Sequence, residues 1–114
     1  TYAIFEIIGG NKNYDRFREE IITTTSLNLG ELYYWLLIRK GKDIVNYWLK
    51  ELKLNFLPIN ERIVLKASHF RFINKGSNFS YIDCIGYVTA LEKGIKFVTG
   101  DDQFKNIENV EFVK

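Results

Sequence analysis

The sequence predicts an α/β fold with a central, mainly parallel sheet and helices on both of its faces. Short apolar or β-branched runs, such as Ile21–Thr24 and Ile95–Val98, alternate with longer segments that carry helix-capping residues. That alternation is typical of a parallel sheet covered by helices. At 114 residues the chain has the size of one domain with one core.

The first third of the chain begins with a predicted helix over Tyr2–Ile8, which ends at Gly9 and Gly10 because glycine lets the backbone leave helical geometry. A polar turn follows over Asn11–Tyr14, and we expect helix again over Phe17–Glu20. The run Ile21–Thr24 is β-branched throughout and predicts a buried strand.

The middle of the chain predicts three helices, two of them with cap signals. Ser26 is a suitable N-cap for a helix over Leu27–Arg39, which ends at Lys40 and Gly41. The next elements that we predict are a helix over Asp43–Leu52, a strand over Asn55–Ile59, and a helix over Glu61–Ile73 capped by Asn60.

The last third reads as helix, strand, turn and strand. Ser80 and Asp83 match a capping box for a helix that runs to Lys93 and ends at Gly94. The elements after it are a strand over Ile95–Val98, a turn over Asp101–Lys105 and a final edge strand over Val110–Val113.

Composition excludes several classes of protein. The net charge is +2 with dispersed cations, so no basic tail is present that could bind nucleic acid as a disordered arm. The most apolar stretch, Leu32–Ile38, falls short of the roughly 20 residues of a membrane helix. The single Cys84 cannot form an internal disulfide, and we expect a buried thiol in a reducing, cytoplasmic compartment.

Glu31 is the first candidate functional acid. Positions Leu27, Trp35 and Ile38 share its helical stripe, and a carboxylate on an apolar stripe costs desolvation unless a cation or hydrogen bonds compensate. The alternative is an acid that is favourable simply because it lies near the start of a helix.

Asp83 and Asp101 are the second and third candidates. Asp101 directly follows a predicted strand, at the edge where open parallel sheets bind ligands. Carboxylates that converge there repel each other unless divalent cations neutralise them. The alternatives are a capping role for Asp83 and a turn role for Asp101, which applies equally to Asp102. Thr99 either supplies a hydroxyl to the same site or fills a strand position.

Other chemistry-bearing residues give weaker signals. His69, the only histidine, has no serine or cysteine partner at a recognisable spacing, so a nucleophilic triad is not expected. The aromatic clusters Tyr33–Trp35 and Tyr47–Trp48 are expected in the core and a subunit interface, with base stacking as the alternative.

These residues together resemble the PIN domain, the metal-dependent ribonuclease fold of the VapC-type toxins. The stretch 81–104 is similar to the family pattern of an aspartate opening a helix, an Ala-Leu pair, a glycine, an apolar strand and Thr-x-Asp-x-x-Phe. Leu29–Leu32 resembles the family's glutamate motif, and Ala67 with Ser68 fits the helix before the aspartate-bearing one.

The resemblance implies a three-layer α/β/α fold over residues 1–114 as a single PIN-like domain. It implies that Glu31, Asp83 and Asp101 hold Mg²⁺ or Mn²⁺, with Thr1, Thr99 and Asp102 in supporting positions. The family also has an aspartate at the end of its first strand. Thr1 resembles the residue that follows it, so we expect that strand and an aspartate immediately upstream of Thr1.

The predicted function is a divalent-metal-dependent endoribonuclease, the toxin of a toxin–antitoxin pair, acting as a homodimer that an antitoxin protein blocks. A non-catalytic PIN-like module that binds RNA or protein is the alternative, and a metal-dependent phosphodiesterase acting on DNA is a second one. The candidate contacts to the RNA backbone are Lys12, Arg16, Lys40, Lys42, Arg71 and Lys75.

Overall fold

The computed structural model describes all residues 1–114 and divides the chain into two compact units. The N-terminal unit spans Thr1–Leu57 and the C-terminal unit spans Pro58–Lys114. Each unit combines helices with one pair of parallel strands, so the predicted α/β class with parallel pairing is confirmed. The strands that the sequence assigned to a central sheet form two separate pairs, one in each unit.

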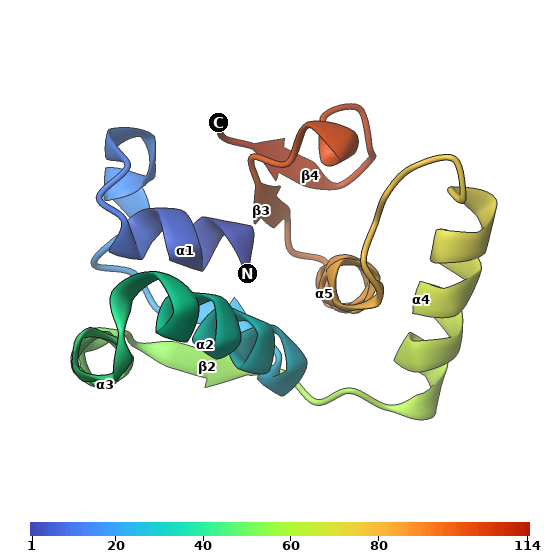
Figure 1. Ribbon diagram of the computed structural model, residues 1–114. Coiled ribbons are helices and arrows are strands. Elements are labelled where there is room, and N and C mark those ends of the chain that lie inside the picture. The colour runs from blue at the N-terminus through green and yellow to red at the C-terminus, as the bar shows by residue number, and fades with distance from the viewer. The chain divides into compact units, whose positions relative to one another are not determined.

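The N-terminal unit has three α-helices, one 3₁₀ helix and two strands. In chain order they are α1 (Tyr2–Ile8), η1 (Lys12–Phe17), β1 (Ile22–Thr24), α2 (Ser26–Lys40), α3 (Lys42–Glu51) and β2 (Leu54–Phe56). Figure 1 shows α2 from the side and α3 end-on, so these consecutive helices run in different directions. Gly41 makes that change of direction with φ of 82°, a left-handed backbone conformation that glycine adopts without steric cost.

The core of the N-terminal unit lies between its helices and its strands. Ile4 and Ile8 of α1, Leu32 and Leu36 of α2, and Val45 of α3 form one buried cluster. Ile22 of β1 and Leu54 of β2 pack against this cluster and face each other across the parallel pair. Burial of these apolar side chains is what orders strands of only three residues each.

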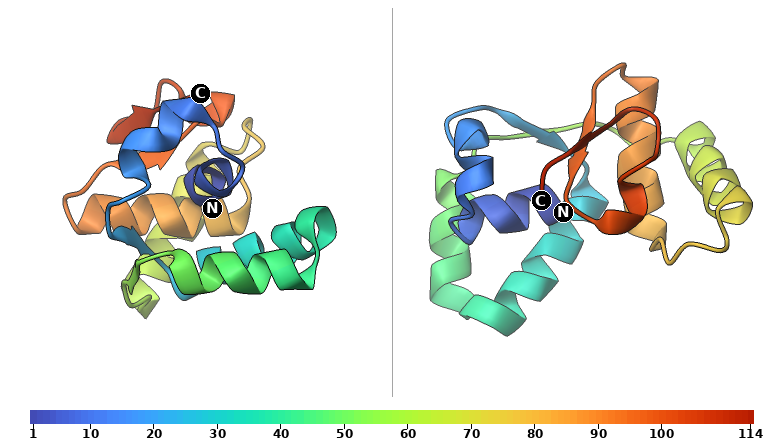
Figure 2. Two further views of the ribbon diagram at one scale, coloured as in Figure 1. Left: turned by 90° about the vertical axis from the view of Figure 1, so that its left-hand side faces the viewer. Right: turned by 90° about the horizontal axis from the view of Figure 1, so that it is seen from above.

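The C-terminal unit has two long helices, one 3₁₀ helix and two strands. They are α4 (Glu61–Ile73), α5 (Tyr81–Glu92), β3 (Phe97–Thr99), η2 (Asp102–Phe104) and β4 (Val110–Phe112). In Figure 1 and in the right-hand view of Figure 2, α4 lies beside α5. The strands pair in parallel, with Phe97 opposite Val110 and Thr99 opposite Phe112.

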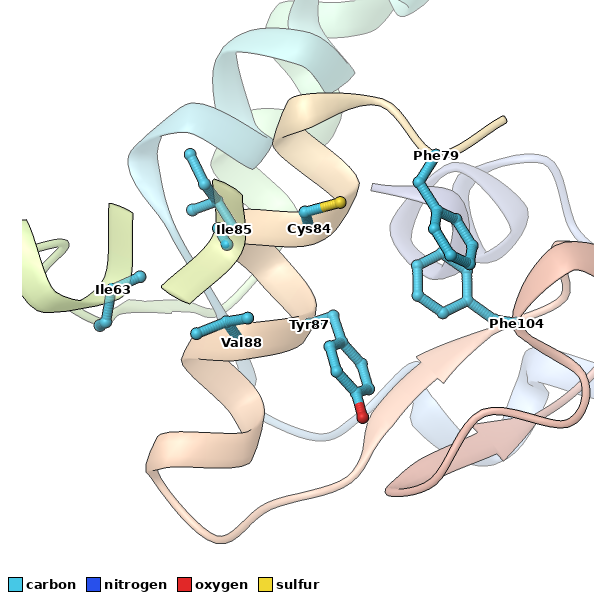
Figure 3. Close-up of a cluster of buried hydrophobic side chains, with 8 residues drawn as sticks. Ile63, Phe79, Cys84, Ile85, Tyr87, Val88 and Phe104 are labelled. Carbon is cyan, nitrogen blue, oxygen red and sulfur yellow. The ribbon is translucent and has the colours of Figure 1, made fainter. Parts of the chain in front are cut away.

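Aromatic rings fill much of the core of the C-terminal unit. Figure 3 shows Cys84, Ile85, Tyr87 and Val88 projecting from α5, with the rings of Phe79 and Phe104 facing each other nearby. The centroids of those two rings are 4.3 Å apart. Cys84 is fully buried among these side chains, as the sequence predicted.

Several helix boundaries follow the sequence signals directly. The helices over Tyr2–Ile8 and Glu61–Ile73 have the predicted bounds. The Asn60 side chain accepts a hydrogen bond from the backbone N–H of Ile63, which confirms the predicted N-cap.

Phe17–Glu20 and Ser26 do not have the predicted structure. Phe17–Glu20 does not continue as a helix, because the N–H groups of Arg18 and Glu20 bond to carbonyls three residues earlier, which forms a 3₁₀ end and a turn. Ser26 is not the N-cap of α2. Thr25 is the cap, since its hydroxyl accepts the N–H of Asn28 at 3.2 Å, and Ser26 is the first helical residue.

The aromatic clusters are less buried than the sequence suggested. Tyr34, Trp35 and Tyr47 are exposed, while Tyr33 and Trp48 are half-buried and pack against the core of the N-terminal unit. The prediction of a core position is therefore wrong for the three exposed rings. Tyr34 and Trp35 on α2 and Tyr47 on α3 lie on faces of these helices that the rest of the unit does not cover.

Candidate metal-binding site

Asp83 lies in the first turn of α5 and is half-buried. The N–H of Asp83 donates to the hydroxyl of Ser80 at 3.0 Å, and the Ser80 N–H donates to Oδ2 of Asp83 at 3.1 Å. The predicted capping box is thus confirmed. These bonds fix the carboxylate with one oxygen on the backbone, and the other oxygen has no hydrogen bond or ion pair within the C-terminal unit.

Asp101 follows β3 and begins the short helix η2. Its N–H donates to the hydroxyl of Thr99 at 3.2 Å, and its Oδ1 accepts the N–H of Gln103 at 3.0 Å. Thr99 is only 2% exposed and ends β3, so the buried hydroxyl holds the backbone of Asp101 at the strand end. As with Asp83, a backbone N–H orients one carboxylate oxygen and leaves the second without a partner in this unit.

A clamp between two loops brings the segments of these aspartates together. The side-chain amide of Gln103 accepts the N–H of Asn78 and donates to the carbonyl of Asn78 at 3.3 Å. Beside it, Phe79 packs on Phe104 (Figure 3). Asn78 and Phe79 lead into α5, while Gln103 and Phe104 belong to η2, so the clamp holds the first turn of α5 next to the end of β3.

Asp102 differs from Asp83 and Asp101 because its charge is paired with a cation. Asp102 is exposed and forms an ion pair with Lys114 at 3.1 Å, and Lys114 also donates to the carbonyl of Gly100 at 3.2 Å. Asp83 and Asp101 have no such ion pair within the C-terminal unit. A supporting role for Asp102 therefore remains a prediction, and its charge is already compensated by a lysine.

Glu31 lies in α2 of the N-terminal unit and is half-buried. Its stripe was expected to be buried, and that expectation is wrong. Leu27, Trp35 and Ile38 on this stripe are exposed by 43%, 45% and 59%, respectively. The buried stripe is offset by one residue and consists of Asn28, Leu32 and Leu36. Glu31 therefore borders the core of this unit and needs no compensating cation for burial.

Thr1 is tied to the same helix by a polar network that the sequence reasoning missed. The amide of Asn28 donates to the Thr1 hydroxyl at 3.2 Å, and the Thr25 hydroxyl donates to Oδ1 of Asn28 at 2.6 Å. Thr25 and Asn28 are both nearly fully buried. The sequence feature that could have indicated this network is Asn28, a polar residue four positions before Leu32 on the helical stripe that Leu32 and Leu36 share. Thr1 therefore lies beside the turn that precedes Glu31.

The acids belong to different units: Glu31 to the N-terminal one, Asp83 and Asp101 to the C-terminal one. Within either unit no group of three or more histidine, cysteine or acidic side chains gathers. The two aspartates nevertheless fit a hard divalent cation, because each presents an uncompensated, backbone-oriented carboxylate with one unused oxygen. The convergence of all three acids stays a prediction.

The remaining reactive groups do not suggest another chemistry. His69 is exposed on α4. Burial, with a smaller contribution from nearby Asp83, raises the pKa of the Cys84 thiol from 9.0 to about 11, so the thiol stays protonated at neutral pH. The buried, protonated thiol disfavours a cysteine-based nucleophilic mechanism.

Comparison with known protein families supports the fold. The family model described as the PIN domain matches residues 1–110, and the chain belongs to this family. PIN domains are generally nucleases that use divalent metals, so membership indicates a nuclease-type or RNA-related function. Comparisons with curated proteins and with solved structures find no match. None of the helices has the length and apolar character that crossing a membrane requires.

Proposed function

We propose that this protein is a divalent-metal-dependent endoribonuclease that hydrolyses RNA phosphodiesters. Asp83, Asp101 and Glu31 are its proposed ligands for Mg²⁺ or Mn²⁺. The observation that carries the proposal is the pair of aspartates, each with one oxygen on a backbone N–H and no cationic partner in its unit. The Gln103–Asn78 clamp supports their proximity.

The chain's own residues have distinct proposed roles. A bound divalent cation supplies Lewis-acid activation of water and neutralises charge at the phosphate. Ser80 and the Gln103 backbone orient the two carboxylates, and the Thr99 hydroxyl fixes the backbone that carries Asp101. Holding the ligands in advance reduces the reorganisation needed when the cation binds.

The biological role proposed for this activity is that of the toxin in a toxin–antitoxin pair, acting as a homodimer and blocked by an antitoxin protein. The support is the resemblance of Leu29–Leu32 and of the stretch 81–104 to VapC-type toxins. Thr1, one of the proposed supporting residues, contacts the helix that carries Glu31 through Asn28.

One observation favours a second candidate, a non-catalytic PIN-like module that binds RNA or protein. The hydrogen bonds of Asp83 and Asp101 are those of ordinary capping and turn residues, so neither side chain needs a metal to account for its position. A module of this kind would keep both aspartates for stability alone.

Asp101→Asn separates the two candidates because asparagine keeps the oxygen that accepts the Gln103 N–H but loses the negative charge. We expect the variant to fold normally and to lose Mn²⁺-dependent cleavage of single-stranded RNA, together with the heat of Mn²⁺ binding in calorimetry. The matched control is Asp15→Asn, which removes an exposed aspartate from the other 3₁₀ helix. It should cleave RNA and bind Mn²⁺ as the unmodified protein does.

Unchanged cleavage by Asp101→Asn would remove this residue from the metal site. Absence of both Mn²⁺ binding and cleavage in the unmodified protein would favour the non-catalytic module. Parallel assays with single-stranded and flapped DNA test the remaining alternative, because preferred cleavage of DNA would contradict the assignment of RNA as the substrate.

A further inference from the structure

Arg71 is held next to the candidate site by a single hydrogen bond. It lies near the end of α4, and its Nε donates to the carbonyl oxygen of Phe79 at 3.2 Å. That carbonyl and the N–H of Ser80 belong to the same peptide group, and the Ser80 N–H is the group that donates to Asp83. Arg71 and Asp83 therefore bind opposite ends of one planar peptide unit.

The charge of Arg71 is not used within its unit. Arg62 and Lys66 on the same helix pair with Glu92, and Lys114 pairs with Asp102. The terminal nitrogens of Arg71 have no hydrogen bond and no acidic partner within the C-terminal unit. Its field still reaches the start of α5, where it lowers the pKa of the Cys84 thiol against the larger opposite effect of burial.

The geometry points to a specific task for this arginine. We propose that Arg71 binds a backbone phosphate of the RNA strand beside the phosphate that Asp83 and Asp101 address. Nε is occupied by Phe79, which leaves the two terminal nitrogens as a preorganised pair of donors. Paired donors of this kind match two oxygens of one phosphate, which a lysine ammonium does not.

The inference rests on the proposed function, because the ligand is a phosphate of the substrate RNA. Among the cationic side chains of the C-terminal unit, Arg71 is distinguished by its position beside the peptide group that Asp83 binds, and not by its charge alone. Lys93 is also exposed but lies at the far end of α5, a helix of 12 residues. Removal of Lys93 takes away the same charge at the opposite end of that helix and provides a matched control.

The test measures RNA binding without cleavage. A fluorescently labelled single-stranded oligo(U) RNA is titrated with the full protein in EDTA, and anisotropy is recorded over a series of KCl concentrations. Arg71→Ala should weaken binding about tenfold at low salt, as the loss of one charge-assisted contact predicts. It should also reduce the slope of log affinity against log salt by about 0.7, the value for one single-strand phosphate contact.

Two further variants separate contact from charge. Lys93→Ala should leave affinity and slope near those of the unmodified protein, and Arg71→Lys should retain the slope while losing part of the affinity. Equal effects of Arg71→Ala and Lys93→Ala would overturn the inference, since they would indicate diffuse attraction. Unchanged RNA binding by Arg71→Ala would also overturn the inference.

Failure of this inference and failure of the proposed function give different results. Normal RNA binding by Arg71→Ala together with lost cleavage by Asp101→Asn rejects only the phosphate contact. No cleavage by the unmodified protein, combined with weaker binding by Arg71→Ala, rejects the nuclease and retains the contact in an RNA-binding module.

Discussion

The two hydrogen bonds between Ser80 and Asp83 allow the capping role of Asp83 to be separated from its proposed metal-binding role. Asp83→Ala removes the oxygen that accepts the Ser80 N–H and also the negative charge in the first turn of α5. The lost hydrogen bond costs about 1 kcal/mol, and the lost interaction of the charge with the helix dipole costs about 0.5 kcal/mol. Asp83→Asn keeps the accepting oxygen, so only the second cost applies.

We therefore expect the free energy of unfolding to fall by about 1.5 kcal/mol in Asp83→Ala and by about 0.5 kcal/mol in Asp83→Asn. Urea denaturation in EDTA measures both values. Mn²⁺ at about 100 times its dissociation constant should then stabilise the unmodified protein by about 2.7 kcal/mol. Both variants should lose most of that gain, because the proposed ligand charge is absent.

Asp43→Asn is the matched control, because Asp43 is an exposed acid in the first turn of α3. It should lose about 0.5 kcal/mol in EDTA and retain the full stabilisation by Mn²⁺. Equal destabilisation by Asp83→Ala and Asp83→Asn would show that the capping bond contributes nothing. Full Mn²⁺ stabilisation of Asp83→Asn would refute the assignment of Asp83 as a metal ligand.

Two further predictions concern the core of the C-terminal unit. Phe104→Ala should lower the free energy of unfolding in a urea titration by about 3–5 kcal/mol, because Phe104 is 1% exposed and contacts the rings of Phe79, Tyr87 and Phe97. The control Phe72→Ala removes a ring that is 65% exposed and should change that free energy by less than about 0.5 kcal/mol. Equal losses in the two variants would contradict the described packing. Cys84 should react slowly with iodoacetamide at neutral pH and rapidly after unfolding. Because folding raises the pKa of the Cys84 thiol from 9.0 to about 11, the protonated thiol contributes fully to the free energy of unfolding below pH 9, and this contribution is lost as the pH rises towards 11. The free energy of unfolding of Cys84→Ala should not show this decrease.

The caps of α4 and α5 were predictable because they depend on residues close together in the sequence. Asn60 caps α4 by accepting the N–H of a residue three positions later, and Ser80 with Asp83 forms a box within four residues. The bonds that define these features need no partner from elsewhere in the chain. The burial of Cys84 was also predictable, since it lies within the apolar pattern of α5.

The errors concern choices between neighbouring candidates. Thr25 and Ser26 are both residues that cap helices well, and the structure uses Thr25. The Asn28 side chain accepts a hydrogen bond from the Thr25 hydroxyl and donates one to Thr1, so the cap is part of a network that includes the distant Thr1. Likewise α2 offers apolar residues on two stripes, and packing against α1 and α3 buries Leu32 and Leu36 rather than Leu27 and Trp35. Neither choice is encoded within one helical turn.

The sequence by itself determined the α/β class and the caps of α4 and α5, since the order of the elements and hydrogen bonds between nearby residues decide these. Only the tertiary structure decided that the segments carrying Asp83 and Asp101 lie next to each other and that Arg71 lies beside the start of α5. The reason is that Gln103 reaches Asn78 across 25 positions, and Arg71 of α4 reaches Phe79 in the loop before α5. Such contacts form only when the apolar core of the C-terminal unit brings α4, α5 and η2 together.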